Sequence, residues 1–363
     1  MNDETPVRIY ANLRSAHLER LPDMVPALMW YSATRDDFDP ELIDPSRAPE
    51  RLSRREILRR LARGRYPVVE VAEPAMTGQW AFLLPQLLVL RLGRLLRRND
   101  TIVTTYCIHN ADPVPEAQVR WRLPSWLARP VVWLGLRLAV ASIDRIAFGT
   151  DGSRSTYERI VGKEALSAAR TFEGIPGRCD CLGADERDAD RVIFVGSFVE
   201  RKGIVPLMSM WEQVHERRPE ARLTLLGKGS LRAEVEAWAR DRSDVDLEID
   251  PPRARIHEAL RTSGVLVLLS QRRGFWREQI GLPILEGLGH GCEIVATTET
   301  GIAGWLVSHD HEVVDPLAPP SAVADAVEAA MERVAERRGS LGDLPASDRR
   351  RAADHWMMTG LEA

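Results

Sequence analysis

Residues 191–203 read RVIFVGSFVERKG, an apolar run that ends at a glycine and is followed by two cations and a second glycine. The same kind of run returns at 223–227 (LTLLG) and at 265–270 (VLVLLS), with helical patterns between. This alternation predicts parallel α/β layering in the second half of the chain. We expect strands at Arg191–Gly196, Leu223–Leu226, Val245–Ile249, Val265–Leu269 and Glu293–Thr297, and helices at Ile204–Arg217, Ser230–Asp241, Ile256–Ser263, Pro283–His290 and Ser321–Arg337.

The first half shows the same alternation less clearly. Its expected strands are Val7–Tyr10, Val68–Val71, Thr101–Tyr106 and Arg145–Phe148, and its expected helices include Ala81–Arg97 and Pro130–Ser142. Glycines, a proline and a charged run between Phe172 and Asp190 predict a linker. With 363 residues, we therefore predict an α/β protein of two Rossmann-like domains facing across a cleft. The domains are 1–175 and 186–340, and a helical tail, 341–363, is expected to pack back toward the N-terminal domain.

Composition excludes several classes of protein. The first residues are acidic where a signal peptide would be basic, and no apolar run reaches the length of a membrane span. Four cysteines are too few for a disulfide framework, and Cys179-x-Cys181 lacks the second ligand pair that a zinc site needs. We expect reduced thiols, no metal site and a cytoplasmic location.

A net charge of −4 hides a basic segment. Residues 51–150 carry sixteen basic and seven acidic side chains. Many of the arginines alternate with leucines and tryptophans: Arg59, Arg60, Arg63, Arg65, Arg91, Arg94, Arg97, Arg98, Arg120, Trp121, Arg122, Trp126, Arg129, Trp133 and Arg137. Such a segment, 51–137, suits an anionic membrane surface or a phosphate-bearing acceptor, and it equally suits a solvated face over a core. Nucleic acid is disfavoured, because the whole chain is acidic and has no binding motif.

Two glycine-containing turns follow the first two strands of the second half. Arg201 and Lys202 could neutralise a diphosphate at a strand end, although such residues are common in loops. Gly227-Lys-Gly229 has neither P-loop spacing nor a full dinucleotide fingerprint, so it is more typical of a tight turn.

The third segment, 278–291, reads EQIGLPILEGLGHG. Pro283 suits the first turn of a helix, and the N–H groups around Gly281–Ile284 would form a phosphate-binding N-terminus. Glu278 and Glu286 lie on either side of this turn and could accept hydrogen bonds from sugar hydroxyls. The alternative is that Glu278 is solvated and Glu286 caps its helix.

The order of these three segments resembles the family 4 retaining glycosyltransferases of the GT-B fold, mainly over 190–335. The resemblance implies that Lys202, with Arg201 beside it and Gly196 before it, contacts the donor diphosphate. It implies that Glu278 contacts donor-sugar hydroxyls. Glu286 would bind the ribose, and the turn at Gly281, Leu282 and Pro283 would offer amides to the phosphates. In the first half, the strand that ends near His109 resembles the one whose histidine lies by the reacting sugar.

The expected activity is hexosyl transfer with retention and without a metal ion, in bacterial cell-surface glycan or glycolipid synthesis. The expected donor is a UDP-sugar rather than a GDP-sugar, with no further cofactor. The acceptor would be a hydroxyl of a glycan, a lipid-linked sugar or a small molecule, at the inner face of the plasma membrane.

Two other classes remain open. A sugar-nucleotide epimerase or hydrolase could share the architecture, and it would turn over without an acceptor. A catalytically silent sugar-nucleotide-binding protein is the second alternative. It is suggested by Ser197, where the family commonly has arginine, and by the missing glycine-rich loop after Val7–Asn12. A nicotinamide oxidoreductase is disfavoured, because no dinucleotide fingerprint follows the first strand.

Overall fold

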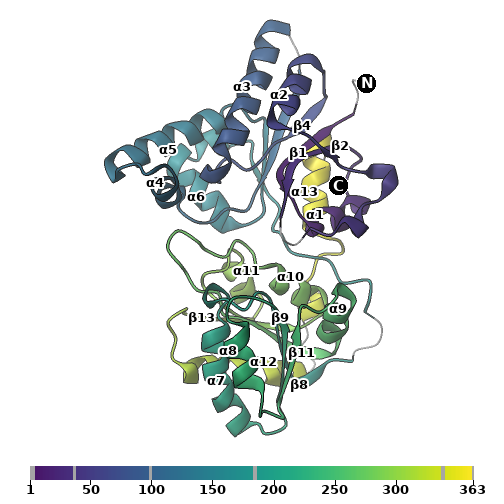
Figure 1. Cartoon of the computed structure of the whole chain (residues 1–363), viewed down its shortest axis with the longest axis vertical. Helices are drawn as coiled ribbons and strands as arrows, with labels where there is room; N and C mark the ends of the chain where they lie inside the picture. Colours follow the sequence, from purple (N-terminus) through teal and green to yellow (C-terminus); the bar gives the residue numbers. More distant parts are fainter. Residues whose placement is uncertain (1–4, 36–37, 98–99, 183–185, 337–339, 362–363) are drawn as a thin grey trace. The chain divides into compact units, whose positions relative to one another are not determined.

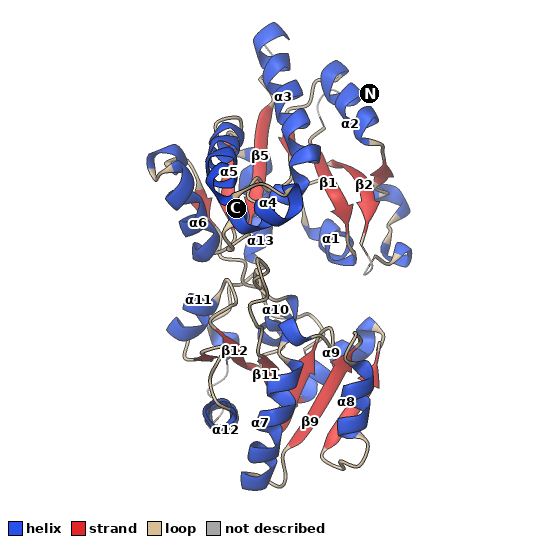
Figure 2. Cartoon of the chain, turned by 60° about the vertical axis from the view of Figure 1, so that its left-hand side comes forward, coloured by secondary structure: helices blue, strands red, loops and turns tan. Residues whose placement is uncertain are grey.

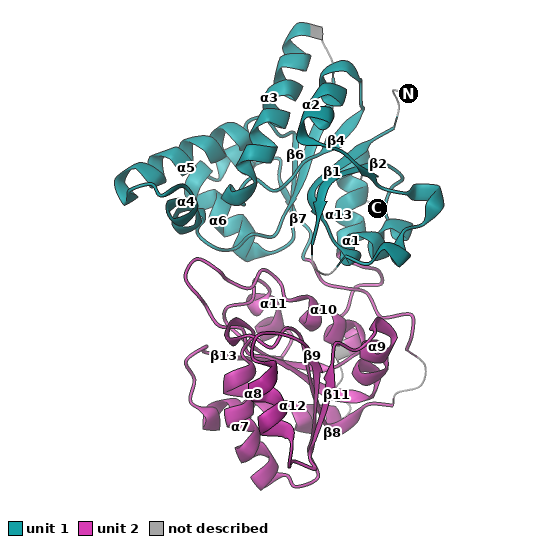
Figure 3. Cartoon of the chain, in the orientation of Figure 1, with its two compact units in different colours: residues 1–173, 350–363 teal, residues 174–349 magenta. Residues whose placement is uncertain are grey.

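The computed structural model describes residues 5–35, 38–97, 100–182, 186–336 and 340–361. The chain forms two compact units (Figure 3). Unit 1 comprises Met1–Glu173 together with Arg350–Ala363, and unit 2 comprises Gly174–Arg349. The chain therefore leaves unit 1 after Glu173 and returns to it at Arg350, within the segment expected to be a helical tail.

Unit 2 is a six-stranded parallel sheet in the order β10-β9-β8-β11-β12-β13. Strands β9 and β11 of this sheet are labelled in Figures 1 and 2. Every residue of β11 and β12 is buried, as expected for parallel strands covered on both faces. The strands are β8 (Asp188–Val195), β9 (Arg222–Gly227), β10 (Val245–Ile249), β11 (Ser263–Leu268), β12 (Glu293–Thr297) and β13 (Glu312–Val314). The helices are α7 (Ile204–Arg217), α8 (Arg232–Ala239), α9 (Arg253–Thr262), α10 (Leu282–Gly289), α11 (Ala303–Ser308) and α12 (Pro320–Ala335).

Unit 1 is a seven-stranded parallel sheet in the order β3-β2-β1-β4-β5-β6-β7. Its strands are β1 (Val7–Leu13), β2 (Leu28–Thr34), β3 (Glu50–Arg51), β4 (Val68–Glu70), β5 (Ile102–Cys107), β6 (Arg145–Phe148) and β7 (Arg170–Thr171). Its helices are α1 (Ser15–Arg20), α2 (Arg54–Arg63), α3 (Trp80–Arg97), α4 (Pro113–Trp121), α5 (Ser125–Val140), α6 (Asp151–Val161) and α13 (Arg349–Thr359). One large apolar cluster fills the space between this sheet and α2, α3, α5 and α6.

The last helix, α13, is tied to the unit 1 sheet by buried charges. Arg8 of β1 donates two hydrogen bonds to Asp354, at 2.7 and 2.8 Å, and its Nε lies 3.2 Å from Glu70 of β4. Arg350 of α13 reaches the other oxygen of Glu70 at 2.9 Å. Each of these four charged side chains is buried next to a charge of the opposite sign, which is how proteins accommodate buried ions.

Several predicted boundaries were wrong. Helix α8 is shorter than Ser230–Asp241, and α9 begins three residues before Ile256. Ser263 starts β11 instead of ending that helix. Strand β8 begins at Asp188, inside the expected linker. Its polar first residues pair with β11, where Ser263 is opposite Asp188, so the strand extends beyond the apolar run.

Two arginines of the predicted features lie outside the described residues. They are Arg98 of the basic segment and Arg337, the expected end of a helix. Over the described residues, no helix is both long and apolar enough to cross a bilayer.

Candidate functional site

The strand order of unit 2 reverses between β8 and β11. From β8 the chain moves outward through β9 and β10, and from β11 it moves in the opposite direction through β12 and β13. In open α/β sheets, ligands bind beyond the carboxyl ends of the strands at such a reversal. The segments that follow β8 and β11 are therefore where a ligand site is expected, and they carry Lys202, Glu278 and the start of α10.

Lys202 and Glu278 contact each other although 76 residues separate them. The Nζ atom of Lys202 lies 2.5 Å from Oε2 of Glu278, and Ser270 donates to the same oxygen at 3.0 Å. Both charged side chains are largely buried, with 13% and 10% of their surface exposed. An ammonium group has three N–H donors, so Lys202 can hold Glu278 and still donate to a second anionic group.

The loop between β11 and α10 contacts the turn that carries Lys202. Trp276 stacks near Arg201, whose guanidinium carbon lies 4.4 Å from the ring centroid, and Lys202 is 5.8 Å from the same centroid. The N–H of Gln271 donates to the carbonyl of Arg201 at 2.9 Å. Two cations are thus held beside one aromatic face, by a cation–π contact and a backbone hydrogen bond.

Glycine at position 203 is required by this turn. Its φ is +78°, in the left-handed region, and a Cβ atom there would lie 1.9 Å from the carbonyl oxygen of Leu269. The turn that carries Lys202 therefore packs directly against the end of β11. This close approach brings Lys202 to Glu278.

The start of α10 agrees with the prediction in part: Pro283 is in the first turn, as expected, but the N–H of Ile284 donates to the carbonyl of Gly281. Gly281 is the residue before the helix, with φ +86°. The first helical hydrogen bonds run from Ile284 and Leu285 back to the carbonyl of Gly281. The amides at the very start of a helix have no acceptor within it, so those of Gly281 and Leu282 can serve an anion.

Glu286 lies one turn into α10 and faces α9. Its Oε1 atom is 2.5 Å from Nη1 of Arg253, and its side chain is 17% exposed against 45% for Arg253. A ligand hydroxyl that reached Glu286 would share this carboxylate with a more exposed arginine. The structure thus shows an ion pair between helices and not the helix cap considered as the alternative.

The glycines after β8 and β9 have a packing role. A Cβ on Gly227 would lie 1.8 Å from the carbonyl oxygen of Gly196, and one on Gly229 would lie 2.3 Å from that of Phe198. The N–H of Phe198 also donates to the carbonyl of Lys228 at 2.8 Å, which ties the two strand ends together. Gly196 therefore shapes the loop that leads to Lys202, and Gly227-Lys-Gly229 is the tight turn that its pattern indicated.

His109 belongs to unit 1, in the segment after β5. Its backbone N–H donates at 2.8 Å to Glu73, and that of Ile108 donates to the other oxygen of the same carboxylate at 3.0 Å. Burial lowers the pKa of His109 and raises the pKa of Glu73 to about 7, although hydrogen bonds to Glu73 oppose the rise. Glu73 positions the His109 segment, and no pattern in the sequence had pointed to it.

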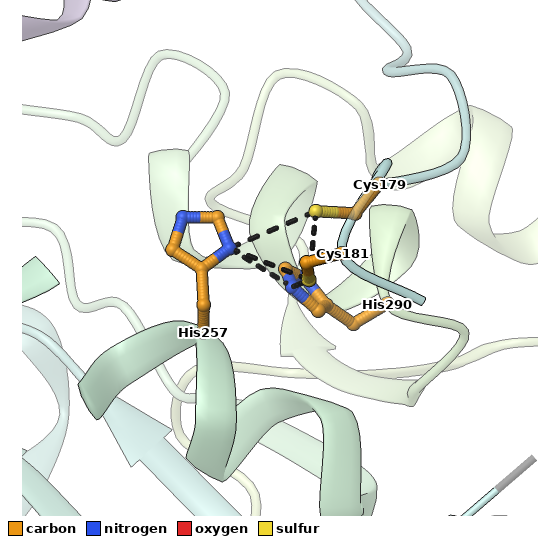
Figure 4. A group of neighbouring side chains, drawn as sticks. All are labelled: Cys179, Cys181, His257 and His290. Atoms are coloured by element: carbon orange, nitrogen blue, oxygen red, sulfur yellow. Dashed lines mark hydrogen bonds between the residues drawn. The ribbon is translucent and has the colours of Figure 1, made fainter. Parts of the chain in front are cut away.

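A second group of side chains was missed by sequence reasoning. Cys179 and Cys181 lie next to His257 of α9 and His290, which follows α10 directly, and one potential ligand atom from each residue lies within 4.8 Å of the others (Figure 4). The expectation that Cys179-x-Cys181 lacks a second ligand pair was therefore wrong. The histidines stand 76 and 109 residues further along the chain than Cys181, a separation at which spacing in the sequence cannot show the contact.

A comparison with known protein families found a match within unit 2. Residues 189–334 match the family model described as "Glycosyl transferases group 1". This segment runs from β8 to α12 and contains Lys202, Glu278, the start of α10 and Glu286. The comparison with curated proteins found no match.

Several solved structures resemble the whole chain. A crystal structure of Anabaena Alr3699/HepE in complex with UDP and glucose shares 11% identity at a TM-score of 0.61, covering 98% of this chain and 95% of that one. WaaG, a glycosyltransferase involved in lipopolysaccharide biosynthesis, shares 12% at 0.59, covering 98% and 100%. An α,α-trehalose 6-phosphate synthase from Burkholderia multivorans shares 15% at 0.62, covering 98% of each chain. The predicted α/β fold of two Rossmann-like domains, the GT-B fold, is confirmed.

Proposed function

We propose that this protein is a glycosyltransferase that takes its sugar from a nucleotide-sugar donor bound at the β8/β11 end of unit 2. The observation that carries the proposal is the Lys202–Glu278 pair beside the start of α10, at the strand reversal and inside the segment that matches the family model. The cation and the helix amides suit phosphate, and the carboxylate suits sugar hydroxyls.

The proposed roles follow from the chemistry of each group. Lys202, with Arg201 beside it, would neutralise charge that develops on the diphosphate leaving group, and the amides of Gly281 and Leu282 would donate to its oxygens. Glu278 would accept hydrogen bonds from the donor sugar. Glu286 would bind the ribose by exchanging part of its contact with Arg253. His109 of unit 1 would contact the reacting sugar.

We further propose retention at the anomeric carbon, transfer without a metal ion and a UDP-sugar donor. Solved structures of Anabaena Alr3699/HepE contain UDP or UDP-glucose, which supports the choice of base. The proposed acceptor is a hydroxyl of a glycan, a lipid-linked sugar or a small molecule. Two cations and the helix amides would provide the positive field that a divalent ion supplies in other transferases.

Turnover assays with UDP-, GDP- and ADP-glucose test the proposal. NMR follows both the released nucleoside diphosphate and the anomeric configuration of the product. We expect UDP release that depends on an added acceptor, an α-linked product from an α-linked donor, and no increase in rate on adding Mg²⁺ or Mn²⁺. UDP release that is equally fast without acceptor would favour a hydrolase. Tight UDP binding with no turnover over a broad acceptor panel would favour the silent binding protein.

An anionic membrane surface is the partner we propose for segment 51–137. Along α3, Leu88, Leu92 and Leu95 repeat at helical spacing and are 58%, 44% and 73% exposed. On α5, Leu134 and Leu138 are 61% and 52% exposed. Arginines are exposed on the same two helices: Arg91, Arg129 and Arg137. Exposed leucines among arginines are the composition by which amphipathic helices bind anionic lipid.

A further inference from the structure

We propose that unit 2 holds a structural zinc ion, bound by Cys179, Cys181, His257 and His290. All four residues belong to unit 2, and none of them takes part in the proposed donor site. Two cysteines and two histidines are a ligand set that zinc uses in structural sites.

Five of the distances between the four ligand atoms lie near the edges of a tetrahedral site, and the sulfur–sulfur and Cys181–His290 distances are the ones that are clearly shorter. For zinc bonds to sulfur and nitrogen of ordinary length, the edges would be about 3.8 Å between sulfurs, 3.6 Å between sulfur and nitrogen and 3.3 Å between nitrogens. The two Sγ atoms are 3.1 Å apart, and Nδ1 of His257 is 3.1 Å from Nε2 of His290. The sulfur–nitrogen distances are 3.6 Å from Cys179 to His257, and 3.8 and 3.1 Å from Cys181 to His257 and His290.

The spacing favours a single metal ion over a disulfide bond or an iron–sulfur centre. A sulfur–sulfur distance of 3.1 Å is far longer than a disulfide bond, and both residues are free cysteines. In an iron–sulfur centre with two histidines, the cysteines and histidines bind different iron atoms, so their ligand atoms cannot all be close neighbours. Here one atom from each residue lies within 4.8 Å of all the others, which fits a single ion.

His290 is oriented for a ligand by its own helix. Its Nδ1 atom lies 2.6 Å from the carbonyl oxygen of Glu286. A carbonyl can only accept, so Nδ1 carries the proton and Nε2 carries the lone pair. Nε2 is the atom that faces Cys181 and His257 (Figure 4). A second nitrogen hydrogen-bonded to a backbone carbonyl is typical of histidine that binds zinc.

The chain segment that carries the two cysteines is fixed against the end of α10. The N–H of Cys179 donates to the carbonyl of Gly289 at 2.8 Å. A Cβ at position 289 would lie 3.3 Å from the carbonyl oxygen of Gly177, so the two backbones are closely packed. The four ligands therefore come from three separate elements that are already in place. Because all four positions are occupied by protein, the ion would join this segment to α9 and α10 and leave no position for a substrate.

The test is the metal content of the full-length protein, purified under reducing conditions, exposed to Zn²⁺ and passed through a desalting column before elemental analysis. We expect about one zinc per chain in the wild type and in two controls, Cys107→Ser and His309→Gln, which remove a cysteine and a histidine outside the cluster. Cys181→Ser and His257→Gln should lose most of the bound zinc. Both positions are at least partly exposed, so these variants should still fold.

Cobalt provides a readout on the unaltered chain. Metal-free wild-type protein titrated with Co²⁺ should develop the intense visible absorption of a tetrahedral ion, with a thiolate charge-transfer band, and added Zn²⁺ should remove both. Any of three results would overturn the proposal: no zinc retained by the wild type, equal zinc in the variants, or a mass that shows Cys179 and Cys181 joined by a disulfide under these conditions. None of these readouts depends on sugar transfer, so the proposed function can fail independently.

Discussion

At the scale of single residues, Lys202 and its partner Glu278 are the groups on which the proposed donor site depends. These two side chains come from the ends of different strands and form a nearly buried ion pair. In the proposed donor complex, an anionic ligand would share Lys202 with Glu278.

We predict that Lys202→Met lowers kcat for sugar transfer by about 100-fold, because removal of one group that stabilises developing charge costs this much in other enzymes. Lys228→Met is the matched control, since its ion pair with Asp250 is exposed. Steady-state kinetics with the preferred donor measures both. Equal rates for Lys202→Met and wild type would contradict the role of Lys202.

A second residue-scale prediction concerns Glu73. Burial raises its pKa from 4.5 to about 7, so the folded protein binds this proton more tightly than the unfolded chain does. The stability associated with the proton is present below pH 4.5 and is lost as the pH rises through about 7. Between about pH 5 and pH 8, the unfolding free energy of the wild type should fall by about 2 to 3 kcal/mol relative to that of Glu73→Gln.

Urea denaturation of both proteins across this pH range gives the difference. The size of this difference in unfolding free energy also contains any hydrogen bonds from Ile108 and His109 that the glutamine side chain loses. The change of the difference with pH reports the Glu73 carboxyl group alone. Parallel curves for the two proteins would show that Glu73 titrates normally.

At the scale of elements, α13 is attached to the unit 1 sheet by the buried group of Arg8, Glu70, Arg350 and Asp354. Asp354 also accepts from the N–H of Val25 at 2.8 Å and has no exposed side-chain surface. Asp354→Ala would leave Arg8 without one of its two carboxylate partners. We predict a loss of about 3 to 5 kcal/mol in the unfolding free energy of unit 1.

The control for this prediction is an exposed ion pair of the same helix. Arg351 lies 3.7 Å from Asp23, and the two side chains are 49% and 58% exposed. Asp23→Ala should therefore cost less than about 1 kcal/mol. Chemical denaturation monitored by tryptophan fluorescence measures both variants. Similar losses in the two variants would mean that the buried group does not anchor α13.

The elements of unit 2 could be predicted from the sequence more fully than those of unit 1. Strands such as β11 are continuous apolar runs bounded by turn residues, so they are recognisable without a structure. Strand β2 was missed because its buried residues Met29 and Trp30 are followed by half-buried ones that include Ser32, so no continuous apolar run marks the strand. The charged start of β8 was missed because backbone pairing, and not side-chain character, determines how far a ladder extends.

The candidate site, too, could be predicted from the sequence only in part. Lys202, Glu278 and the start of α10 were named from the sequence, since each lies in a segment that joins a recognisable strand to the next helix. The partners Ser270 and Arg253, the carboxylate Glu73 and the histidines of the Cys179 cluster were not. Those contacts depend on tertiary packing between segments that are far apart in the chain, which local pattern does not contain.

At the scale of the whole molecule, the exposed leucines of α3 and α5 lead to a prediction on membrane binding. The double variant Leu92→Gln/Leu95→Gln should bind vesicles of phosphatidylglycerol and phosphatidylcholine at least about tenfold more weakly than wild type, because it removes apolar area available for burial. Leu317→Gln, at an 87% exposed leucine of unit 2, should bind as wild type. Vesicle sedimentation measures the affinities, and equal binding of all three proteins would contradict the assignment.

We propose that unit 2 binds a nucleoside diphosphate through the turn after β8 and through α10. Calorimetric titration of the full-length protein with UDP tests it most directly, on the wild type, Glu286→Gln and the control Glu258→Gln, whose side chain is 59% exposed on α9. We predict that wild type and Glu258→Gln bind UDP equally and that Glu286→Gln binds at least about tenfold more weakly, the cost of one charged hydrogen bond. Undiminished binding by Glu286→Gln, or no binding of UDP, GDP or ADP by the wild type, would contradict the account.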